Sequence, residues 1–124
     1  MKRVITAGVA AAIAAAVVGG AFARPAMTNP KLKGTVGPGF SINLTMNGKK
    51  VKTLKPGKYT FVIADKASIH NFTLEREKGG KFEKDLTDVS FTGTKTVTLK
   101  LGKGTWKYYC TPHESVMFGF FKVK

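Results

Sequence analysis

The chain has 124 residues and a mass of 13.4 kDa, enough for one domain. Its 21 Lys and Arg stand against 7 Asp and Glu, a net charge of +14. A single Cys excludes an intramolecular disulfide framework, and two His exclude a metal cluster that needs several imidazoles. Few Ala follow residue 23, whereas Thr and aromatic residues are common there, so the composition disfavours a helical bundle and suits strands.

Residues 1–23 have the pattern of an export signal. A cationic start, MKR, precedes an uncharged Ala-rich stretch that ends in Ala21-Phe22-Ala23. These features match the n-region, h-region and A-x-A site of a secretory signal peptide. We expect cleavage after Ala23 and a mature protein in the periplasm, the cell envelope or outside the cell. An uncleaved membrane anchor is the alternative, because about 20 apolar residues can span a bilayer.

The segment after the signal is predicted to be a lead-in over residues 24–33, followed by one domain over residues 34–124. Pro and Gly interrupt the chain from Arg24 to Gly39, and apolar alternation with a period of two begins at Phe40. The alternation stops at the turn signal Asn47-Gly48. The pattern therefore predicts that the lead-in precedes the folded domain, which begins at about residue 34.

Alternating apolar residues predict six strands between turn signals. They fall at residues 40–46, 59–65, 69–77, 97–101, 106–110 and 118–123. Short strands with this spacing indicate a small antiparallel sandwich or barrel. Residues 78–91 are predicted to be a loop with a short helix, because Gly79-Gly80 opens the stretch and Phe82 and Leu86 fit one helical turn.

Every Cys and His of the chain lies in one of two short segments. The first is SIHNF at residues 68–72, and the second is YCTPHESVM at residues 109–117. One thiolate, two imidazoles and one thioether are the ligand types of a blue-copper site, in which two His and a Cys form a plane and a Met is a weak axial ligand. Pro112 bends the chain after Cys110, so His113 can turn back toward the same metal.

The pattern C-T-P-H-x-x-x-M, followed by Phe-Gly and preceded by H-N-F, resembles the cupredoxins of the plastocyanin/amicyanin-like type. The resemblance covers about residues 34–124. It implies an all-β, Greek-key β-sandwich of about seven or eight strands that holds one copper ion, Cu(I)/Cu(II). The residues it implies as copper ligands are His70, Cys110, His113 and Met117. It also implies that Asn71 and Thr111 join the two ligand segments by hydrogen bonding. The spacing from His to Met is intermediate between those of plastocyanins and amicyanins.

Each of these residues also fits a role that involves no copper. Cys110 alone fits a buried small side chain, each His a polar residue at a strand end, and Met117 core packing. A Cys–His nucleophile pair is the enzymatic alternative, and zinc is the alternative metal. Neither explains all four residues, because Met is a poor zinc ligand and no hydrolase motif has this spacing. We therefore expect a copper protein that is not an enzyme.

The expected function is one-electron transfer between redox partner proteins outside the cytoplasm. Storage, delivery or resistance to copper is the alternative, since it would use the same ligands. The positive charge favours acidic partner proteins or an anionic envelope. Nucleic acid is not an expected partner, because no helical basic face or Arg-rich run is present. We expect a monomer without stable membrane insertion after signal cleavage.

Overall fold

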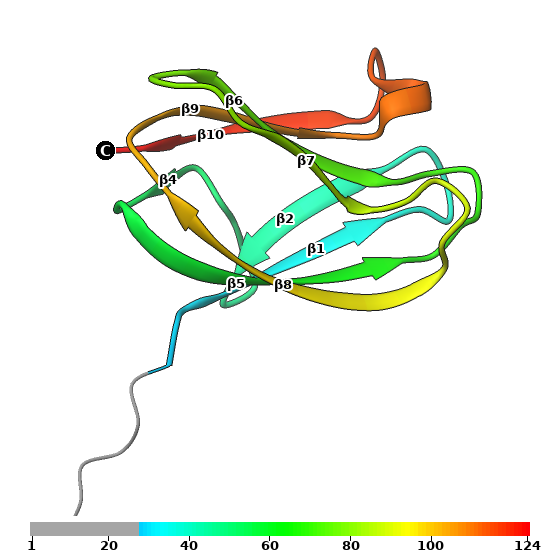
Figure 1. Cartoon of the computed structure of the whole chain (residues 1–124). Helices are drawn as coiled ribbons and strands as arrows, with labels where there is room; N and C mark the ends of the chain where they lie inside the picture. Colours follow the sequence, from blue (N-terminus) through cyan, green and yellow to red (C-terminus); the bar gives the residue numbers. More distant parts are fainter. Residues whose placement is uncertain (1–27) are drawn as a thin grey trace, which may run out of the picture.

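The computed structural model describes residues 28–124, and the predicted signal peptide lies outside them. Two five-stranded sheets pack face to face over this range (Figure 1). Sheet A has the strand order β3-β2-β1-β5-β8, and sheet B has the order β4-β10-β9-β6-β7. The prediction of an all-β sandwich is confirmed.

The strands are short and most run antiparallel to their neighbours. Sheet A contains β1 (Lys31–Val36), β2 (Ile42–Met46), β3 (Lys49–Lys50), β5 (Gly57–Asp65) and β8 (Gly93–Leu101). Sheet B contains β4 (Thr53–Leu54), β6 (Phe72–Lys78), β7 (Glu83–Thr87), β9 (Gly104–Tyr109) and β10 (Phe118–Val123). The described residues thus form ten strands rather than seven or eight, and β3 and β4 have only two residues each.

The core lies between the two sheets and is built from alternating strand positions. In β5 the predicted alternation is confirmed, because Tyr59, Phe61 and Ile63 are all buried. Gly34 in β1 allows the sheets to approach closely. A Cβ at Gly34 would lie 2.5 Å from Cδ1 of Ile63 and 2.9 Å from Cε2 of Phe72. All ten strands lie between residues 31 and 123, so a chain that starts at Arg24 contains the complete fold.

The predicted lead-in is wrong at its C-terminal end, because Lys31 already begins β1. This strand pairs antiparallel with β2 and parallel with β5, and the carbonyl oxygen of Pro30 accepts a hydrogen bond of 2.9 Å from the amide of Thr60. The alternation in β1 was hard to recognise because its central inward position is Gly34, which has no side chain. The domain therefore begins at least three residues before residue 34.

The prediction of a loop and short helix over residues 78–91 is also wrong. This stretch contains strand β7, which pairs antiparallel with β6 at the edge of sheet B. Only Leu86 and Thr87 of β7 are buried. An edge strand with charged residues at most positions lacks the apolar alternation that identifies a half-buried strand.

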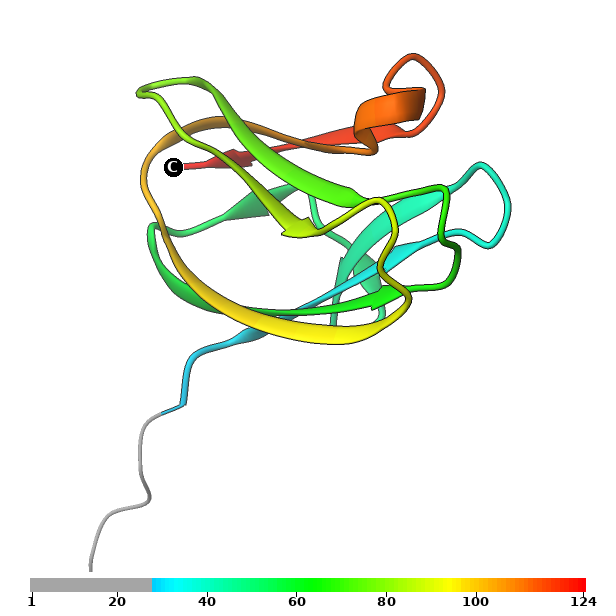
Figure 2. The ribbon, with the colours of Figure 1, turned by 45° about the vertical axis from the view of Figure 1, so that its right-hand side comes forward.

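The connections between strands gather at the two ends of the sandwich. The site end, on the right in Figures 1 and 2, contains residues 37–41, 66–71, 88–92 and 110–117. The opposite end contains the turns at 47–48, 55–56, 79–82 and 102–103. Asn47 and Gly48 have φ values of 52° and 81°, as the predicted hairpin turn requires. Across residues 28–124, no helix has the length and apolarity needed to cross a membrane.

Candidate metal centre

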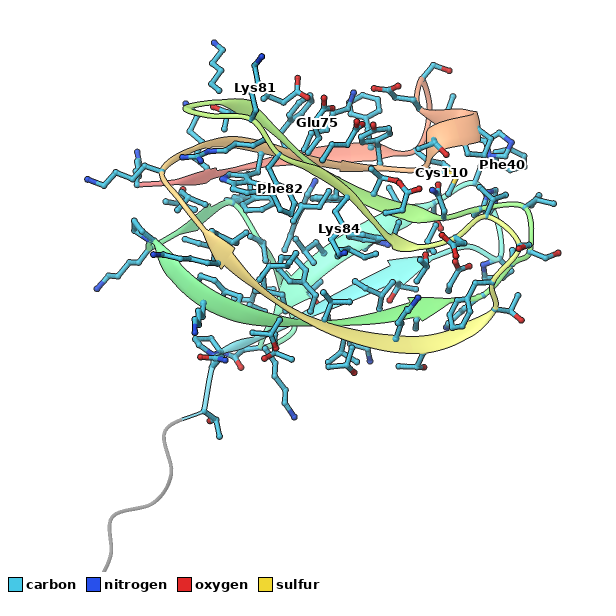
Figure 3. The ribbon with its side chains drawn as sticks, viewed as in Figure 1. Phe40, Glu75, Lys81, Phe82, Lys84 and Cys110 are labelled. Carbon is cyan, nitrogen blue, oxygen red and sulfur yellow. The ribbon has the colours of Figure 1, made fainter. Side chains whose placement is uncertain are left out.

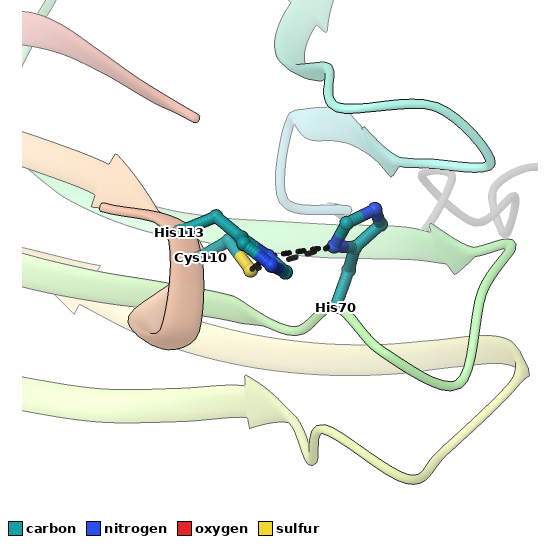
Figure 4. Close-up of side chains that lie close together, drawn as sticks. All are labelled: His70, Cys110 and His113. Carbon is teal, nitrogen blue, oxygen red and sulfur yellow. Dashed lines mark hydrogen bonds between the residues drawn. The ribbon is translucent and has the colours of Figure 1, made fainter. Parts of the chain in front are cut away.

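Three potential ligand atoms converge at the site end from two separate connections. His70 lies in the β5–β6 connection, whereas Cys110 and His113 lie between β9 and β10. The two Nδ1 atoms of His70 and His113 are 3.1 Å apart. Sγ of Cys110 lies 3.8 Å from Nδ1 of His70 and 3.5 Å from Nδ1 of His113 (Figure 4). Residues 43 positions apart in the sequence are thus brought into one cluster.

The spacing of these atoms fits a single metal ion. Bonds of about 2.0–2.3 Å to nitrogen and sulfur, directed to the corners of a triangle, place the donor atoms about 3.5–4 Å apart. The observed separations run from 3.1 to 3.8 Å. Both imidazoles present the same nitrogen, Nδ1, to the centre. Small movements of the two rings would therefore accommodate a metal ion between them and the thiol.

The segment from Cys110 to Met117 folds back on itself to form a compact loop. A short 3-10 helix, η2 (Thr111–His113), has Pro112 in its first turn. The amide of His113 donates to the carbonyl oxygen of Cys110 at 3.1 Å, and the amide of Cys110 donates to the carbonyl oxygen of Met117 at the same distance. The amide of Met117 donates to the carbonyl oxygen of His113 at 2.9 Å. The loop is thus closed by backbone hydrogen bonds that join the three residues directly.

Asn71 joins the two connections that supply the cluster. Its Oδ1 atom accepts a 2.7 Å hydrogen bond from the amide of Thr111 and a 3.2 Å bond from the hydroxyl of Thr111. Its Nδ2 atom donates to Oγ1 of Thr73 at 3.1 Å, and this hydroxyl donates to Oδ1 of Asp85 at 2.7 Å. Asn71 is buried, so water cannot replace these partners. The position of His70 relative to Cys110 therefore depends on this amide.

The cluster is closed to solvent on all sides except at His113. The exposed fraction is 0% for His70, Cys110 and Met117, whereas His113 is partly exposed. Phe40 covers both imidazoles edge-on, with ring centroids 5.2 Å from His70 and 4.7 Å from His113. One ring edge, that of His113, thus connects the buried cluster with the surface.

A family model for copper binding proteins of the plastocyanin/azurin family matches residues 41–124, more than half of the chain. The chain belongs to this family. It is a cupredoxin, and its cofactor is copper. The resemblance inferred from the sequence is therefore confirmed, together with the predicted cofactor. No curated protein matches the chain.

Solved structures support the same fold for this cupredoxin. A structure of reduced rusticyanin is 24% identical with a TM-score of 0.50, covering 76% of this chain and 78% of that one. An NMR structure of reduced rusticyanin is 20% identical with a TM-score of 0.51, covering 76% of both chains. A variant of reduced amicyanin is 16% identical with a TM-score of 0.48, covering 79% of this chain and 86% of that one. At these identities the rusticyanin structures support the sandwich fold alone.

The structure brings the predicted residues of the cupredoxin site into one region. His70, Cys110 and His113 form the cluster, and Asn71 and Thr111 are joined by hydrogen bonds as expected. Met117 is buried at the end of the ligand loop, where its backbone bonds to both loop ligands.

Phe40 and Gly37 lie directly beside the imidazoles, and the sequence did not predict these contacts. Phe40 was predicted to lie in a strand, but it lies before β2 and is 59% exposed. Gly37 was treated as turn punctuation, but a Cβ there would lie 3.2 Å from Cδ2 of His70, and its φ of 77° also favours glycine. The Gly-Pro-Gly run after β1 was the available signal, because it marks a connection whose backbone must approach its neighbours closely.

Acidic side chains of this cupredoxin gather on the outer face of sheet B. Glu75 lies opposite both Glu83 and Lys107 in the strand register, and Lys107 forms a 2.5 Å ion pair with Glu114. The hydroxyl of Tyr109 donates to Glu83. A hydrogen bond with Glu77, together with burial and nearby carboxylates, raises the pKa of Glu75 from 4.5 to about 7 (Figure 3). The charge of this face therefore changes near neutral pH.

The raised pKa of Glu75 predicts a pH dependence of stability. Because the folded protein holds this proton more tightly than the unfolded chain, its contribution is complete below pH 4.5 and is lost as the pH rises through about 7. We expect Glu75→Gln to raise the melting temperature of the copper-free protein at pH 8 and to change it little at pH 4.5. Thermal unfolding at both pH values measures this difference.

The matched control is Asp88→Asn, which removes a carboxylate from an exposed connection. We expect this control to show no such difference between the two pH values. An equal rise in melting temperature at both pH values for Glu75→Gln would show that the carboxylate cluster holds no shared proton.

Proposed function

We propose that this cupredoxin is an exported one-electron carrier that holds its copper with His70, Cys110, His113 and, more weakly, Met117. The observation that carries the proposal is the convergence of two imidazole nitrogens and one thiol in a cluster that reaches solvent only at His113. A thiolate and a thioether suit Cu(I), and imidazole suits both oxidation states. Copper supplies the reversible electron exchange when it is bound.

The protein around the cluster is suited to an electron carrier because it limits movement of the ligands. Asn71 joins the two connections, and backbone hydrogen bonds close the loop from Cys110 to Met117. Ligands held in this way change position little when the metal changes charge, which keeps the barrier to electron transfer low. We propose that Asn71 and Thr111 are the positioning residues of the site.

The exposed edge of His113 is the proposed point at which electrons enter and leave. Large apolar side chains are exposed at the site end around it, including Phe40, Ile69 and Val116. Pro112 in η2 and Phe118 at the start of β10 are also exposed. A small apolar surface allows a redox partner to dock briefly and to leave after transfer. We propose that redox partners bind this surface and that the protein acts as a monomer without catalysing a reaction.

Burial of the ligands favours an electron carrier over a protein that stores or delivers copper. Delivery requires an incoming ligand to reach the metal, but Cys110 and Met117 have no exposed surface. Electron transfer requires only that one ligand edge approach the partner, and His113 meets this condition. Export after cleavage at Ala23 remains a prediction from the sequence, as does a periplasmic or extracellular location.

The test is copper binding and exchange by the protein that begins at Arg24. We expect Cu(II) to give an intense thiolate-to-copper absorption band, and small redox reagents to reduce and reoxidise it within seconds. A Cu(I) chelator in excess should remove the metal far more slowly, over hours. Removal as fast as reduction would support delivery of copper, and absence of the band would contradict the copper site.

The proposed weak axial role of Met117 predicts a particular outcome for Met117→Leu. A long thioether bond contributes little to metal retention, so we expect copper and colour to remain. Loss of the donor favours Cu(I), so the reduction potential should rise, on the order of 60 mV for a tenfold change in the one-electron equilibrium. Spectroelectrochemical titration measures this shift.

Met46→Leu is the control. It makes the same change in composition, but Met46 lies in β2 of sheet A, away from the ligand loop. Its potential should equal that of the unmodified protein. Loss of copper from Met117→Leu would instead show that Met117 is a strong ligand.

A further inference from the structure

The outer face of sheet A is basic and carries no acidic side chain. Side chains at alternate positions of a strand point to the same side, and the strand register identifies those that point away from the core. Five of them are lysines and six are threonines: Lys31, Lys33, Lys50, Lys58, Lys100, Thr35, Thr45, Thr60, Thr94, Thr96 and Thr98. The hydroxyls of Thr60 and Thr98 lie 3.2 Å apart across this face. We call this outer surface of sheet A, with its five lysines, the basic face.

The lysines of the basic face occupy the middle of sheet A and the end that is distant from the metal centre. Lys31 is in register with Thr60 of β5, and Lys33 and Lys50 lie on the row of Val62. Lys58 lies opposite Lys100 at the start of β5, and Lys31 begins β1. At the other end of the same strands, Thr35 lies opposite Ala64.

The positive charge of the basic face is centred away from His113. At about 3.3 Å per residue, Lys58 lies about 23 Å along β5 from Asp65 at the site end, and the row of Lys33 and Lys50, at Val62, lies about 10 Å from it. The first distance is about twice the screening length of about 10 Å at 0.1 M salt. The connections at the site end contain one lysine, Lys66, against Asp88 and Glu114. The acidic partner proteins that the net charge favours would therefore be attracted mainly to sheet A rather than to His113.

We infer that the basic face binds the surface of an anionic lipid bilayer and leaves the copper end directed away from it. Lysines near an anionic bilayer surface are attracted to its headgroups. Among residues 28–124, the large exposed apolar side chains are at positions 40, 69, 89, 116, 118 and 120, and none lies on the basic face. Contact with lipid would therefore be electrostatic and superficial, without insertion.

The path of the chain favours a bilayer over a soluble acidic partner. The chain enters the fold at Lys31, which is itself part of the basic face. The apolar segment at residues 4–23 precedes this point by seven residues, 24–30, which reach at most about 25 Å when extended. Before cleavage, or without it, a membrane-inserted segment would hold the basic face close to the bilayer. Binding through this face would also leave the apolar surface around His113 free for a redox partner.

The test is sedimentation of the copper-loaded protein, beginning at Arg24, with phospholipid vesicles. We expect binding to vesicles that contain phosphatidylglycerol, no binding to pure phosphatidylcholine, and loss of binding as salt is raised. The triple variant Lys31→Glu, Lys33→Glu, Lys58→Glu should bind at least about 100-fold more weakly, since each lysine contributes about fivefold. Its absorption band should be unchanged, which shows that it is folded.

The matched control is the triple variant Lys66→Glu, Lys81→Glu, Lys84→Glu. It has the same net charge but leaves the basic face intact, so we expect it to retain most of its binding. An equal loss of vesicle binding in both triple variants would show an effect of net charge alone and would overturn the inference. Binding to a soluble polyanion without binding to the vesicles would also overturn it, in favour of a polymeric or protein partner.

The orientation is tested separately by reduction of the bound protein with a small soluble reductant. We expect the same rate with and without vesicles, because His113 faces away from the lipid. A rate much reduced by vesicles would show that the copper end faces the bilayer. Because sedimentation requires no electron transfer, failure of lipid binding and failure of the proposed electron-carrier function give different results.

Discussion

Replacement of Cys110 by Ser should abolish the intense visible band of the copper-loaded protein. The band arises from charge transfer between the thiolate and the metal, and Cys110 is the one cysteine of the chain. Its Sγ lies within 3.8 Å of both imidazole Nδ1 atoms, where it completes the cluster of three potential ligand atoms. A serine hydroxyl is also a poor ligand for Cu(I), so we expect copper affinity to fall by several orders of magnitude. Visible absorption and copper titration measure both effects.

The control is Val116→Ser, which introduces the same hydroxyl into the ligand loop at an exposed position. We expect this variant to keep its colour. The two histidines should differ when imidazole is added to glycine variants. His113 is partly exposed, so imidazole should restore colour to His113→Gly, but His70 has no exposed surface and His70→Gly should recover poorly. Colour that survives Cys110→Ser would contradict the proposed ligand set.

Asn71→Ala should destabilise the protein and also disturb the metal centre. The substitution removes the acceptor of two hydrogen bonds from Thr111 and the donor of one to Thr73, all at a buried position. Three hydrogen bonds at about 0.5–1.5 kcal/mol each, with one amide left unpaired, predict a loss of about 2–4 kcal/mol. For a domain of about 100 residues this lowers the melting temperature by roughly 10–20 °C. Thermal unfolding measures it.

The matched control is Asn43→Ala, the same substitution on the exposed side of β2, where we expect a change below about 0.5 kcal/mol. A positioning role also predicts an effect beyond stability. Below its melting temperature, copper-loaded Asn71→Ala should show a shifted absorption band, because the two ligand connections are no longer joined. An unchanged band and potential would show that Asn71 supports the fold without orienting the site.

Local features of the sequence were sufficient to predict the sandwich and the copper-binding family, and three of the proposed ligands, His70, Cys110 and His113, lie together in the structure. Alternation at Tyr59, Phe61 and Ile63 depends only on the two-residue period of a strand with one buried face. Three ligand types, supplied by four residues at a characteristic spacing, indicate blue copper because few metals accept thiolate, imidazole and thioether together. These signals depend on neighbouring residues or on composition, so they can be recognised without knowledge of the fold.

Strands without an apolar pattern could be recognised only in the tertiary structure. Strand β1 has Gly34 at its central inward position because Phe72, from the other sheet, occupies the space of a side chain. Strand β7 is charged because it lies at a sheet edge. The neighbour that decides the structure of β1, Phe72, comes from a distant part of the sequence. Strand β7 pairs with the strand that precedes it, β6, but its place at the end of sheet B is set by the whole fold.

The distribution of charge likewise depended on the fold. Composition alone showed the excess of lysine, and it led to the expectation of acidic partner proteins or an anionic envelope. The tertiary structure places Lys58 and Lys100 at one end of the sandwich and the cluster of His70, Cys110 and His113 at the other. This separation follows from the direction of the strands, because the nine residues of β5 carry its two ends about 26 Å apart. Net charge adds over the whole chain, but attraction and docking depend on where each charge lies.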